Sequence, residues 1–322
     1  MSKKSTTAMM RIAIAGGGGF ANILARQLAE SAHAIISNWS QAHSEFEEYG
    51  CQVVIVDYNN MDALQFTLRG VDLIISTISG PEQVNLIDAA RRARVSRFVP
   101  SEFEGSLAQR PNDDPIDRGS STALEFLGRC AASRSRPMLF TVFSCGVFYE
   151  RFAQGGLEAL NMGGSLGIQY QGGYMLDLGR GIAEIPLTNA QGRSVHVTMT
   201  SVYDVAAFVA AAIDLGIDSW PREFRMRGAH VTTQRLVEIC QEVVGVQLDV
   251  VPRPYQELLD WLRYYEEMQD HVNWRKMLHL IQTANGRYAF TDVNLNDHVD
   301  FQPMGLRTWL QNNYFYGQGQ QL

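Results

Sequence analysis

The stretch that decides the fold lies near the start of the chain and reads Arg11-Ile12-Ala13-Ile14-Ala15-Gly16-Gly17-Gly18-Gly19-Phe20-Ala21-Asn22. The apolar run predicts a buried strand, and the apolar residues that recur from Phe20 onward predict a helix directly after it. Glycines at 16 and 19 permit a tight turn and a close approach to bare main chain. Because free N–H groups and the helix dipole both favour anions there, the stretch predicts a strand–turn–helix that holds the pyrophosphate of a dinucleotide.

Outward from this turn, short apolar runs alternate with helical patterns up to about residue 145. We expect further strands at 33–37, 52–56, 72–76, 97–99 and 138–142, and a helix over 119–133. This alternation favours a parallel sheet covered by helices on both faces. The predicted fold class is α/β, a Rossmann doubly wound parallel sheet with a smaller mixed α/β substrate lobe. Later helices are expected at 233–244, 255–267, 272–283 and 304–313.

We place an NAD(P)-binding Rossmann domain at 8–150 and a substrate-binding lobe at 151–322, some segments of which return to the Rossmann sheet. The Gly-rich stretch 155–181 has little periodicity and is expected to form loops over a pocket. Within it, GGSLG at 163–167 matches the GxSxG elbow of hydrolases. That motif needs a strand before the serine and a helix after it. Here a helical pattern precedes it and a loop follows, which argues against a hydrolase.

Composition and charge exclude several classes of binding partner. The net charge of −7 argues against nucleic-acid binding, which needs a basic face. The sequence contains no run of 18 apolar residues, so we expect no membrane span. No apolar leader segment precedes the first strand, so we expect no signal peptide. The four cysteines form no CxxC pair and the seven histidines no HExxH pair, so we expect reduced thiols, no metal and a cytoplasmic location. A monomer and a homodimer are both open.

One count stands out among the basic residues. Of 27 lysines and arginines, only Lys3, Lys4 and Lys276 are lysines. A mechanism that needs a lysine in the body of the fold therefore has almost no candidates.

Four segments carry a family resemblance: AGGGGFAN at 15–22, VDYNNMDALQFTLRGVDLIISTISG at 56–80, RFVPSEFEG at 97–105 and PMLFTVFSCGVFYERF at 137–152. Together they resemble the NmrA-like, isoflavone-reductase-like atypical short-chain dehydrogenases common in fungal secondary metabolism. The resemblance implies NADPH/NADP as cofactor, with NAD less favoured, and a small hydrophobic substrate. It also implies reduction of enones, ketones or benzylic ethers, although some relatives only sense the dinucleotide.

The resemblance and the sheet edge together assign residues. Cofactor contacts are expected at Gly16, Gly18, Gly19, Phe20, Asn22, Asn38, Ser40, Asp57, Thr77, Ile78, Ser79, Ser101 and Cys145. Substrate contacts are expected at Phe103, Phe148, Tyr149, Tyr170, Tyr174 and Met175. Asp57 reads equally well as a residue that starts a turn.

The chain departs from the family at the end of the second strand. The family has an arginine there for the 2′-phosphate of NADPH, whereas Ser37–Gln41 contains neither an arginine nor an acidic residue. Asn38 and Ser40 can hydrogen-bond a phosphate, but more weakly than a guanidinium fork.

The second departure is catalytic. The family's reductases use a lysine on the helix before the sixth strand, and here that position falls on Ser120 or Ser121. A serine supplies no charge and no pKa near neutrality. Proton delivery then falls to Glu102, Tyr149, Tyr174 or a bound water, although each side chain also reads as a packing residue.

The leading functional prediction is an NADPH-dependent reductase that transfers hydride to a C=C, C=N or C=O group of a secondary metabolite. An iminium acceptor suits a site without a lysine because it already carries the positive charge. One alternative is a cofactor-bound cyclase or isomerase, for example a Diels–Alderase, which needs shape more than a proton shuttle. The other is a non-catalytic NADP(H) sensor.

Overall fold

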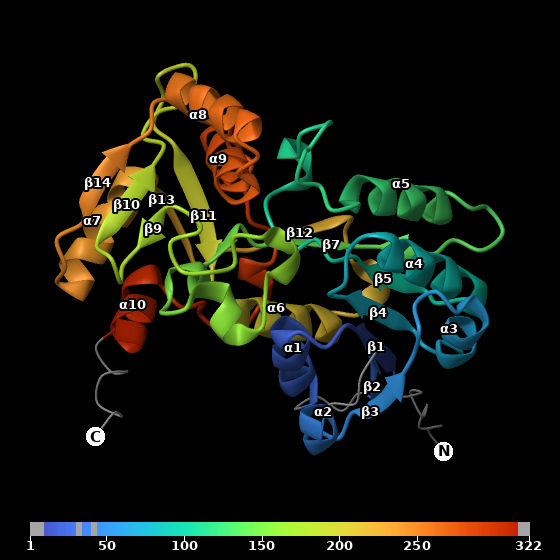
Figure 1. Ribbon diagram of the computed structural model, residues 1–322. Coiled ribbons are helices and arrows are strands. Elements are labelled where there is room, and N and C mark those ends of the chain that lie inside the picture. The colour runs from blue at the N-terminus through green and yellow to red at the C-terminus, as the bar shows by residue number, and fades with distance from the viewer. Residues whose placement is uncertain (1–9, 30–33, 40–43, 315–322) are drawn as a thin grey trace. The chain divides into compact units, whose positions relative to one another are not determined.

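A six-stranded parallel sheet organises the first half of the chain (Figure 1). The computed structural model describes residues 10–29, 34–39 and 44–314. The strand order is β3-β2-β1-β4-β5-β6, which is the Rossmann order with its crossover between β1 and β4. The predicted fold class is therefore confirmed. The strands are β1 (Arg11–Ala15), β2 (Ala34–Trp39), β3 (Gln52–Ile55), β4 (Leu73–Ser76), β5 (Arg97–Val99) and β6 (Leu139–Phe140).

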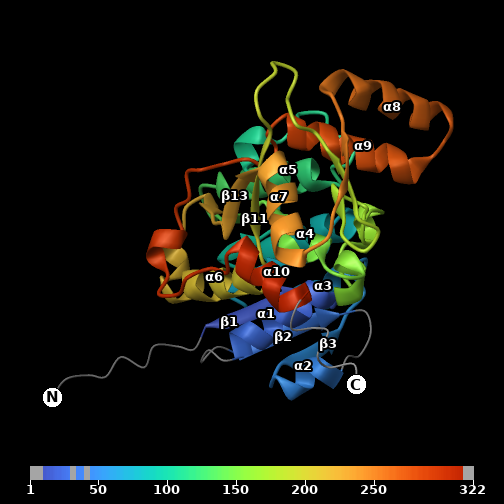
Figure 2. The ribbon, with the colours of Figure 1, turned by 90° about the vertical axis from the view of Figure 1, so that its left-hand side faces the viewer.

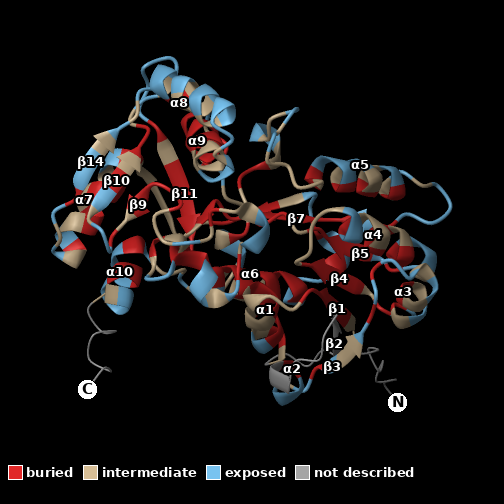
Figure 3. Cartoon of the chain, in the orientation of Figure 1, coloured by how far each residue is buried: buried red, intermediate tan, exposed pale blue. Residues whose placement is uncertain are grey.

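Helices join these strands and form two rows. In one row α1 contacts α2, and in the other α4 lies between α3 and α5 (Figure 1). The helices are α1 (Gly19–Ala29), α2 (Ser44–Glu48), α3 (Met61–Thr67), α4 (Pro81–Ala93) and α5 (Ser120–Ala131). Interior strands β4 and β5 are wholly buried, whereas the edge strand β3 is partly exposed (Figure 3). The apolar runs in the sequence thus mark the centre of the sheet, as expected for strands covered on both faces.

The chain divides into two compact units. Unit 1 comprises 1–102, 118–142 and 212–222, and unit 2 comprises 103–117, 143–211 and 223–322. Unit 1 includes segment 212–222, which follows the boundary placed at residue 150. Segment 212–222 belongs with the sheet of unit 1 because Thr141 and Val142 hydrogen-bond to it: the Thr141 hydroxyl donates to the Pro221 carbonyl at 2.7 Å, and the Val142 N–H donates to the Arg222 carbonyl at 3.0 Å.

Unit 2 combines small sheets with helices. Its sheets have the orders β14-β10-β9, β13-β11-β8 and β12-β7. The strands are β7 (Val142–Ser144), β8 (Val147–Phe148), β9 (Leu176–Asp177), β10 (Ile182–Ile185), β11 (His196–Thr200), β12 (Glu223–Arg225), β13 (Ala229–Thr232) and β14 (Asp249–Pro252). The helices are α6 (Val202–Asp214), which runs past Ala211 into unit 1, α7 (Thr233–Val244), α8 (Tyr255–Glu267), α9 (His271–Ala284) and α10 (Leu306–Tyr314).

Helices α8 and α9 lie side by side, as Figure 2 shows. Short 3-10 helices fill much of the remaining chain: η1 (Leu107–Gln109), η2 (Tyr149–Phe152), η3 (Gly156–Leu160), η4 (Gly164–Leu166), η5 (Ile217–Ser219) and η6 (Asn296–His298). Ser165 lies in η4 and follows η3 rather than a strand, so the hydrolase elbow is not formed. Over the described part of the chain, no helix has both the length and the apolar character needed to span a bilayer.

Candidate functional site

The glycine turn between β1 and α1 presents bare main chain. Gly16 has a φ of +122°, and a Cβ atom added to it would lie 2.0 Å from the Oγ1 atom of Thr77 and 3.3 Å from the Cγ2 atom of Ile78. A side chain at position 16 is therefore excluded both by its backbone conformation and by its neighbours. The sequence-predicted Gly16, Thr77 and Ile78 thus lie together.

Thr77 fastens the end of β4 to the end of β1. Its N–H and its hydroxyl both donate to the carbonyl of Ala15, at 2.8 and 3.0 Å. The Ser76 hydroxyl donates to the Ile78 carbonyl at 3.1 Å and so shapes the loop that continues through Ser79. Because β1 and β4 are the strands at which the sheet order reverses, this loop lies where Rossmann proteins bind dinucleotides.

The first turn of α1 follows directly from the glycines. The Asn22 N–H donates to the Gly18 carbonyl at 3.1 Å, the first hydrogen bond of the helix, and Phe20 is buried. The N–H groups ahead of Asn22 have no intrahelical acceptor, which makes this end a potential anion site. The Asn22 side chain accepts from the Tyr49 hydroxyl at 3.5 Å.

Residues after β3 complete the surroundings of Gly16. The Asp57 side chain accepts a hydrogen bond from the Asn59 N–H at 2.9 Å. This bond is typical of an aspartate that starts a turn, which is the alternative role considered for Asp57. The contact of Asp57 with the cofactor stays a prediction. Tyr58, the next residue, is buried, and its hydroxyl hydrogen-bonds the Gly16 main chain. Burial raises the pKa of Tyr58, which the Gly16 bond only partly offsets.

The amino ends of α4 and α5 meet at two glycines. The Gly80 N–H donates to the Arg118 carbonyl at 3.0 Å, and a Cβ atom on Gly119 would lie 3.2 Å from the Gly80 Cα atom. Helix α5 then begins at Ser120, which is buried, followed by Ser121, which is exposed. The two serines at the family's lysine position therefore differ in their access to water.

The end of β5 is held by a residue that the sequence did not single out. The Ser101 N–H donates to Oε1 of Gln83 at 2.7 Å, and Glu102 beside it is 3% exposed. Gln83 is fully buried, and its Nε2 atom has no hydrogen-bond partner among the described residues. Nothing in the sequence marks Gln83 beyond its position in the first turn of α4. As a proton donor, Glu102 stays a prediction.

The sequence family accounts for this arrangement. The model of the NmrA-like family matches residues 9–294, which is most of the chain. This chain belongs to the NmrA-like family. The resemblance that the glycine turn and the PSEF segment carried is thereby confirmed.

Individual relatives match over shorter stretches. The isoflavone reductase homologue A622 of Nicotiana tabacum is 33% identical over 108 residues, which cover 29% of this chain and 35% of the tobacco protein. Oxidoreductase swnR of Metarhizium robertsii is 28% identical over 111 residues, or 32% of this chain and 36% of that protein. These matches thus span about a third of each relative's length.

A solved structure resembles almost the whole NmrA-like chain. AtPrR2, determined with NADP+ and (+)-pinoresinol, superposes with a TM-score of 0.71 at 17% identity, over 94% of this chain and 98% of that one. At this identity the likeness shows the fold.

Part of the expected site lies outside the described residues or is described only as main chain. Ser40 lies in the undescribed segment 40–43. Asn38 pairs with Ala15 in the register of β2 with β1, which brings its main chain beside the start of the glycine turn. Their contacts with a 2′-phosphate stay predictions.

Lys276, the lysine within the described residues, forms an ion pair. In unit 2, the Lys276 ammonium lies 2.6 Å from Oε2 of Glu184, and the Arg253 guanidinium lies 2.6 Å from Oε1. Burial acts to raise the pKa of Glu184, but the hydrogen bonds and charges of Lys276 and Arg253 outweigh it and hold that pKa below its ordinary value. Lys276 therefore serves an ion-pair network.

Two expected proton donors, Tyr149 and Tyr174, lie in the core of unit 2. The Tyr149 side chain is fully buried and its hydroxyl donates to the Met304 carbonyl at 3.2 Å. The Tyr174 hydroxyl lies 2.7 Å from that of Thr283 and must donate, because Thr283 gives its own proton to a main-chain carbonyl. Burial raises the pKa of both tyrosines, to about 12 for Tyr174. Each hydroxyl thus has an acceptor within unit 2, and the catalytic and substrate roles of both side chains stay predictions.

The other expected substrate contacts in unit 2 fall into two groups. Met175 is 2% exposed in the same core as Tyr174, whereas Tyr170 is 37% exposed and lines a cavity of about 430 Å³. Their contacts with substrate stay predictions. Phe103 is buried and stacks on Phe143 at 6.2 Å between ring centroids.

Cys145 precedes β8, and Phe148 is the last residue of that strand. Cys145 is wholly buried, its N–H donates to the Glu104 carbonyl at 2.9 Å, and burial raises the pKa of its thiol. Phe148 is half-buried. Contacts of Cys145 with cofactor and of Phe148 with substrate stay predictions.

Proposed function

We propose that this NmrA-like protein is an NADP(H)-dependent reductase of a hydrophobic small molecule. The observation that carries the proposal is the cradle at Gly16, where a positive φ and the contact with Thr77 keep the main chain bare at the start of α1. A pyrophosphate needs this combination of close approach and free N–H groups. AtPrR2, which shares the fold, binds NADP+.

The residues around the cradle fit such a cofactor. The main chain of 16–20 would hold the pyrophosphate, and Thr77–Ser79 would line its path across the sheet edge. Asn38 and Ser40 would bind the 2′-phosphate in place of the family's arginine, so NADPH is favoured over NAD with a weaker preference than an arginine gives. When bound, NADPH supplies a hydride.

The chemistry proceeds without the family's lysine. Ser120 or Ser121 can hydrogen-bond a ribose hydroxyl at the amino end of α5 but cannot carry a proton at neutral pH. Glu102, buried at the end of β5, is the candidate proton donor in unit 1. An iminium acceptor needs no protonation to become electrophilic, so we propose C=N reduction ahead of C=O reduction.

The first test is cofactor binding. The fluorescence of NADPH titrated with protein should report a complex, and Gly16→Ala should abolish it because the new methyl group collides with Thr77. Gly50→Ala is the matched control: Gly50 also has a positive φ, +75°, but an added Cβ meets nothing within 4 Å. Binding that survives Gly16→Ala, or no NADPH binding at all, would overturn the proposal.

Turnover then separates the proposed reductase from its rivals. A reductase consumes NADPH in proportion to product, a redox-neutral cyclase forms product without consuming it, and a sensor binds it without product. Cyclic imines should be reduced faster than the matched ketones. Equal rates would remove the basis for the C=N preference. Ser120→Ala should lower kcat more than Ser121→Ala if the buried serine holds the ribose.

A further inference from the structure

A cavity of unit 1 lies at the opposite edge of the sheet from the glycine turn. It has a volume of about 420 Å³ and is lined at the amino ends of β5 and β6 by Arg97 and Leu139. Because all six strands are parallel, the carboxyl ends that carry Thr77 and Ser101 are at the other edge. The cavity is thus separate from the proposed cofactor site.

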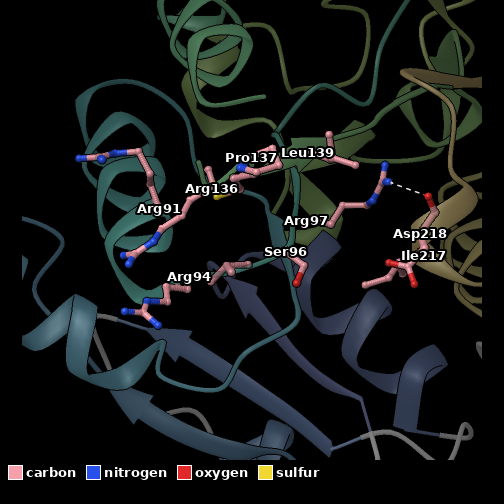
Figure 4. Close-up of a pocket in the computed structure, with 11 residues that line it drawn as sticks. Arg91, Arg94, Ser96, Arg97, Arg136, Pro137, Leu139, Ile217 and Asp218 are labelled. Atoms are coloured by element: carbon pink, nitrogen blue, oxygen red, sulfur yellow. Dashed lines mark hydrogen bonds between the residues drawn. The ribbon is translucent and has the colours of Figure 1, made fainter. Parts of the chain in front are cut away.

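The lining of this cavity is strongly basic. Four arginines and one carboxylate supply its charged side chains, in a protein whose net charge is −7. Figure 4 shows three of the arginines on one side and the fourth beside the acidic residue on the other. These residues are Arg91, Arg94 and Arg136, with Arg97 facing Asp218.

Arg97 is a buried cation held by neutral groups. It is 3% exposed, and its guanidinium donates to the Thr141 hydroxyl at 2.8 Å and to the carbonyls of Trp220 and Asp218 at 3.3 and 3.5 Å. Burial lowers the pKa of Arg97, and the charge of Asp218 offsets this only in part. A charge in such surroundings is stabilised by an anion nearby.

The remaining arginines come from separate segments. Arg91 and Arg94 lie at the carboxyl end of α4, where the helix dipole favours cations. The helix dipole does not explain the other two arginines. Arg136 is exposed in the loop before β6, and Arg97 lies in β5. Arg91 forms a salt bridge with Asp88 at 2.8 Å. Arg94 and Arg136 are exposed.

We infer that this cavity binds a small phosphate ester. Guanidinium groups match the geometry of phosphate oxygens, and more than one arginine per carboxylate suits a dianion. The volume is within the range of ligand pockets. Ile217 and Leu139, the latter 42% exposed, add an apolar wall for the organic part of the ester.

The test uses phenyl phosphate and inorganic phosphate as probes in titration calorimetry at constant ionic strength. Phenyl phosphate should bind more tightly than inorganic phosphate because of the apolar wall. Arg94→Gln and Arg136→Gln should each weaken phenyl phosphate about threefold to tenfold, the scale of one charge-assisted hydrogen bond at a partly exposed site. Arg134→Gln is the matched control, since Arg134 is also exposed but does not line the cavity.

Three results would overturn the inference. One is an equal loss in Arg134→Gln, which would indicate a general effect of charge. Another is unchanged affinity in the double variant Arg94→Gln/Arg136→Gln. The third is competition by saturating NADP+, which would place the phosphate at the glycine turn instead. Failure here leaves the proposed reductase untouched, because Gly16→Ala tests that separately.

Discussion

A missing methyl group at Gly16 decides what the main chain at this point can hold. Thr77 occupies the space where a Cβ atom of residue 16 would lie. The Tyr58 hydroxyl takes a hydrogen bond from the main chain of Gly16. The turn is therefore fixed from both sides before any ligand arrives, which lowers the ordering cost of binding.

At the same scale, the scarcity of lysine leads to a prediction for Lys276. Lys276→Met should lower the free energy of unfolding by about 1–3 kcal/mol, because Glu184 loses one partner of a largely buried pair. NADPH binding and turnover should stay unchanged. Urea unfolding and steady-state rates measure the two effects. A loss of turnover in a stably folded variant would contradict a lysine-free mechanism.

The pH dependence of this difference follows from Glu184. The pKa of Glu184 is lower in the folded state than in the unfolded chain. The ion pair therefore contributes fully to the free energy of unfolding above the ordinary glutamate pKa, and this contribution is lost as the pH falls through the pKa of Glu184 in the folded state. The gap between wild type and Lys276→Met should therefore narrow on acidification below about pH 4.5. Arg263→Gln, which breaks an exposed pair with Asp260, should cost less than about 0.5 kcal/mol.

Individual residues could be predicted from the sequence only where a local motif carried them. Gly16 and Thr77 follow from the turn and the strand end. Gln83 and the partner of Tyr58 depend on contacts between segments far apart in the chain, which periodicity does not reveal. The sequence alone does not distinguish a core position from a pocket position for Tyr149 and Tyr174, because a tyrosine looks the same in either setting.

Among the elements, the segment after β5 is constrained by close packing within unit 2. A Cβ atom on Gly105 would lie 1.9 Å from the Arg287 carbonyl oxygen. Arg287 itself is 1% exposed, and its guanidinium donates to the Ser106 carbonyl at 2.8 Å. The glycine that ends the RFVPSEFEG motif therefore has a packing reason.

Gly105→Ala should accordingly destabilise the protein by about 3 kcal/mol, because the obstacle is main chain that cannot swing aside. Thermal and urea unfolding measure the loss. Gly164→Ala is the control, since its added methyl group meets nothing within 4 Å, and it should stay within about 0.5 kcal/mol of wild type. Similar stabilities for the two variants would show that the segment yields more easily than its packing implies.

Periodic helices and the strands of the sheet centre were predictable, including the three-residue strand at 97–99, whereas a break within a strand was not. The expected helices at 233–244 and 255–267 agree with α7 and α8 to the residue. The single strand expected at 138–142 is instead two, β6 and β7, on either side of Thr141. The break has a cause outside the local sequence, because the Thr141 side chain is bound to Arg97 and to the Pro221 carbonyl.

On the scale of the whole molecule, the order of segments in the chain does not follow the two units. The chain passes between them at 102, 117, 142, 211 and 222. A composition shift near residue 150 does not say which segments return to unit 1, because each of them is only 11 to 25 residues long and carries no signature of its own. The glycine turn, the ends of β4 and β5, and the start of α5 nevertheless all belong to unit 1, as the sheet pattern alone required.

Cofactor binding to this turn should stabilise the protein by linkage. NADP+ at a hundredfold excess over its Kd should add about 2.7 kcal/mol to the free energy of unfolding, because the cradle at Gly16 exists only in the folded chain. For a protein of this size, that corresponds to a rise in Tm of about 5 °C in scanning calorimetry. The Gly16→Ala variant should show no rise. NAD+ at the same concentration should give a smaller one, and an equal rise with NAD+ would mean that the segment after β2 does not select for the 2′-phosphate.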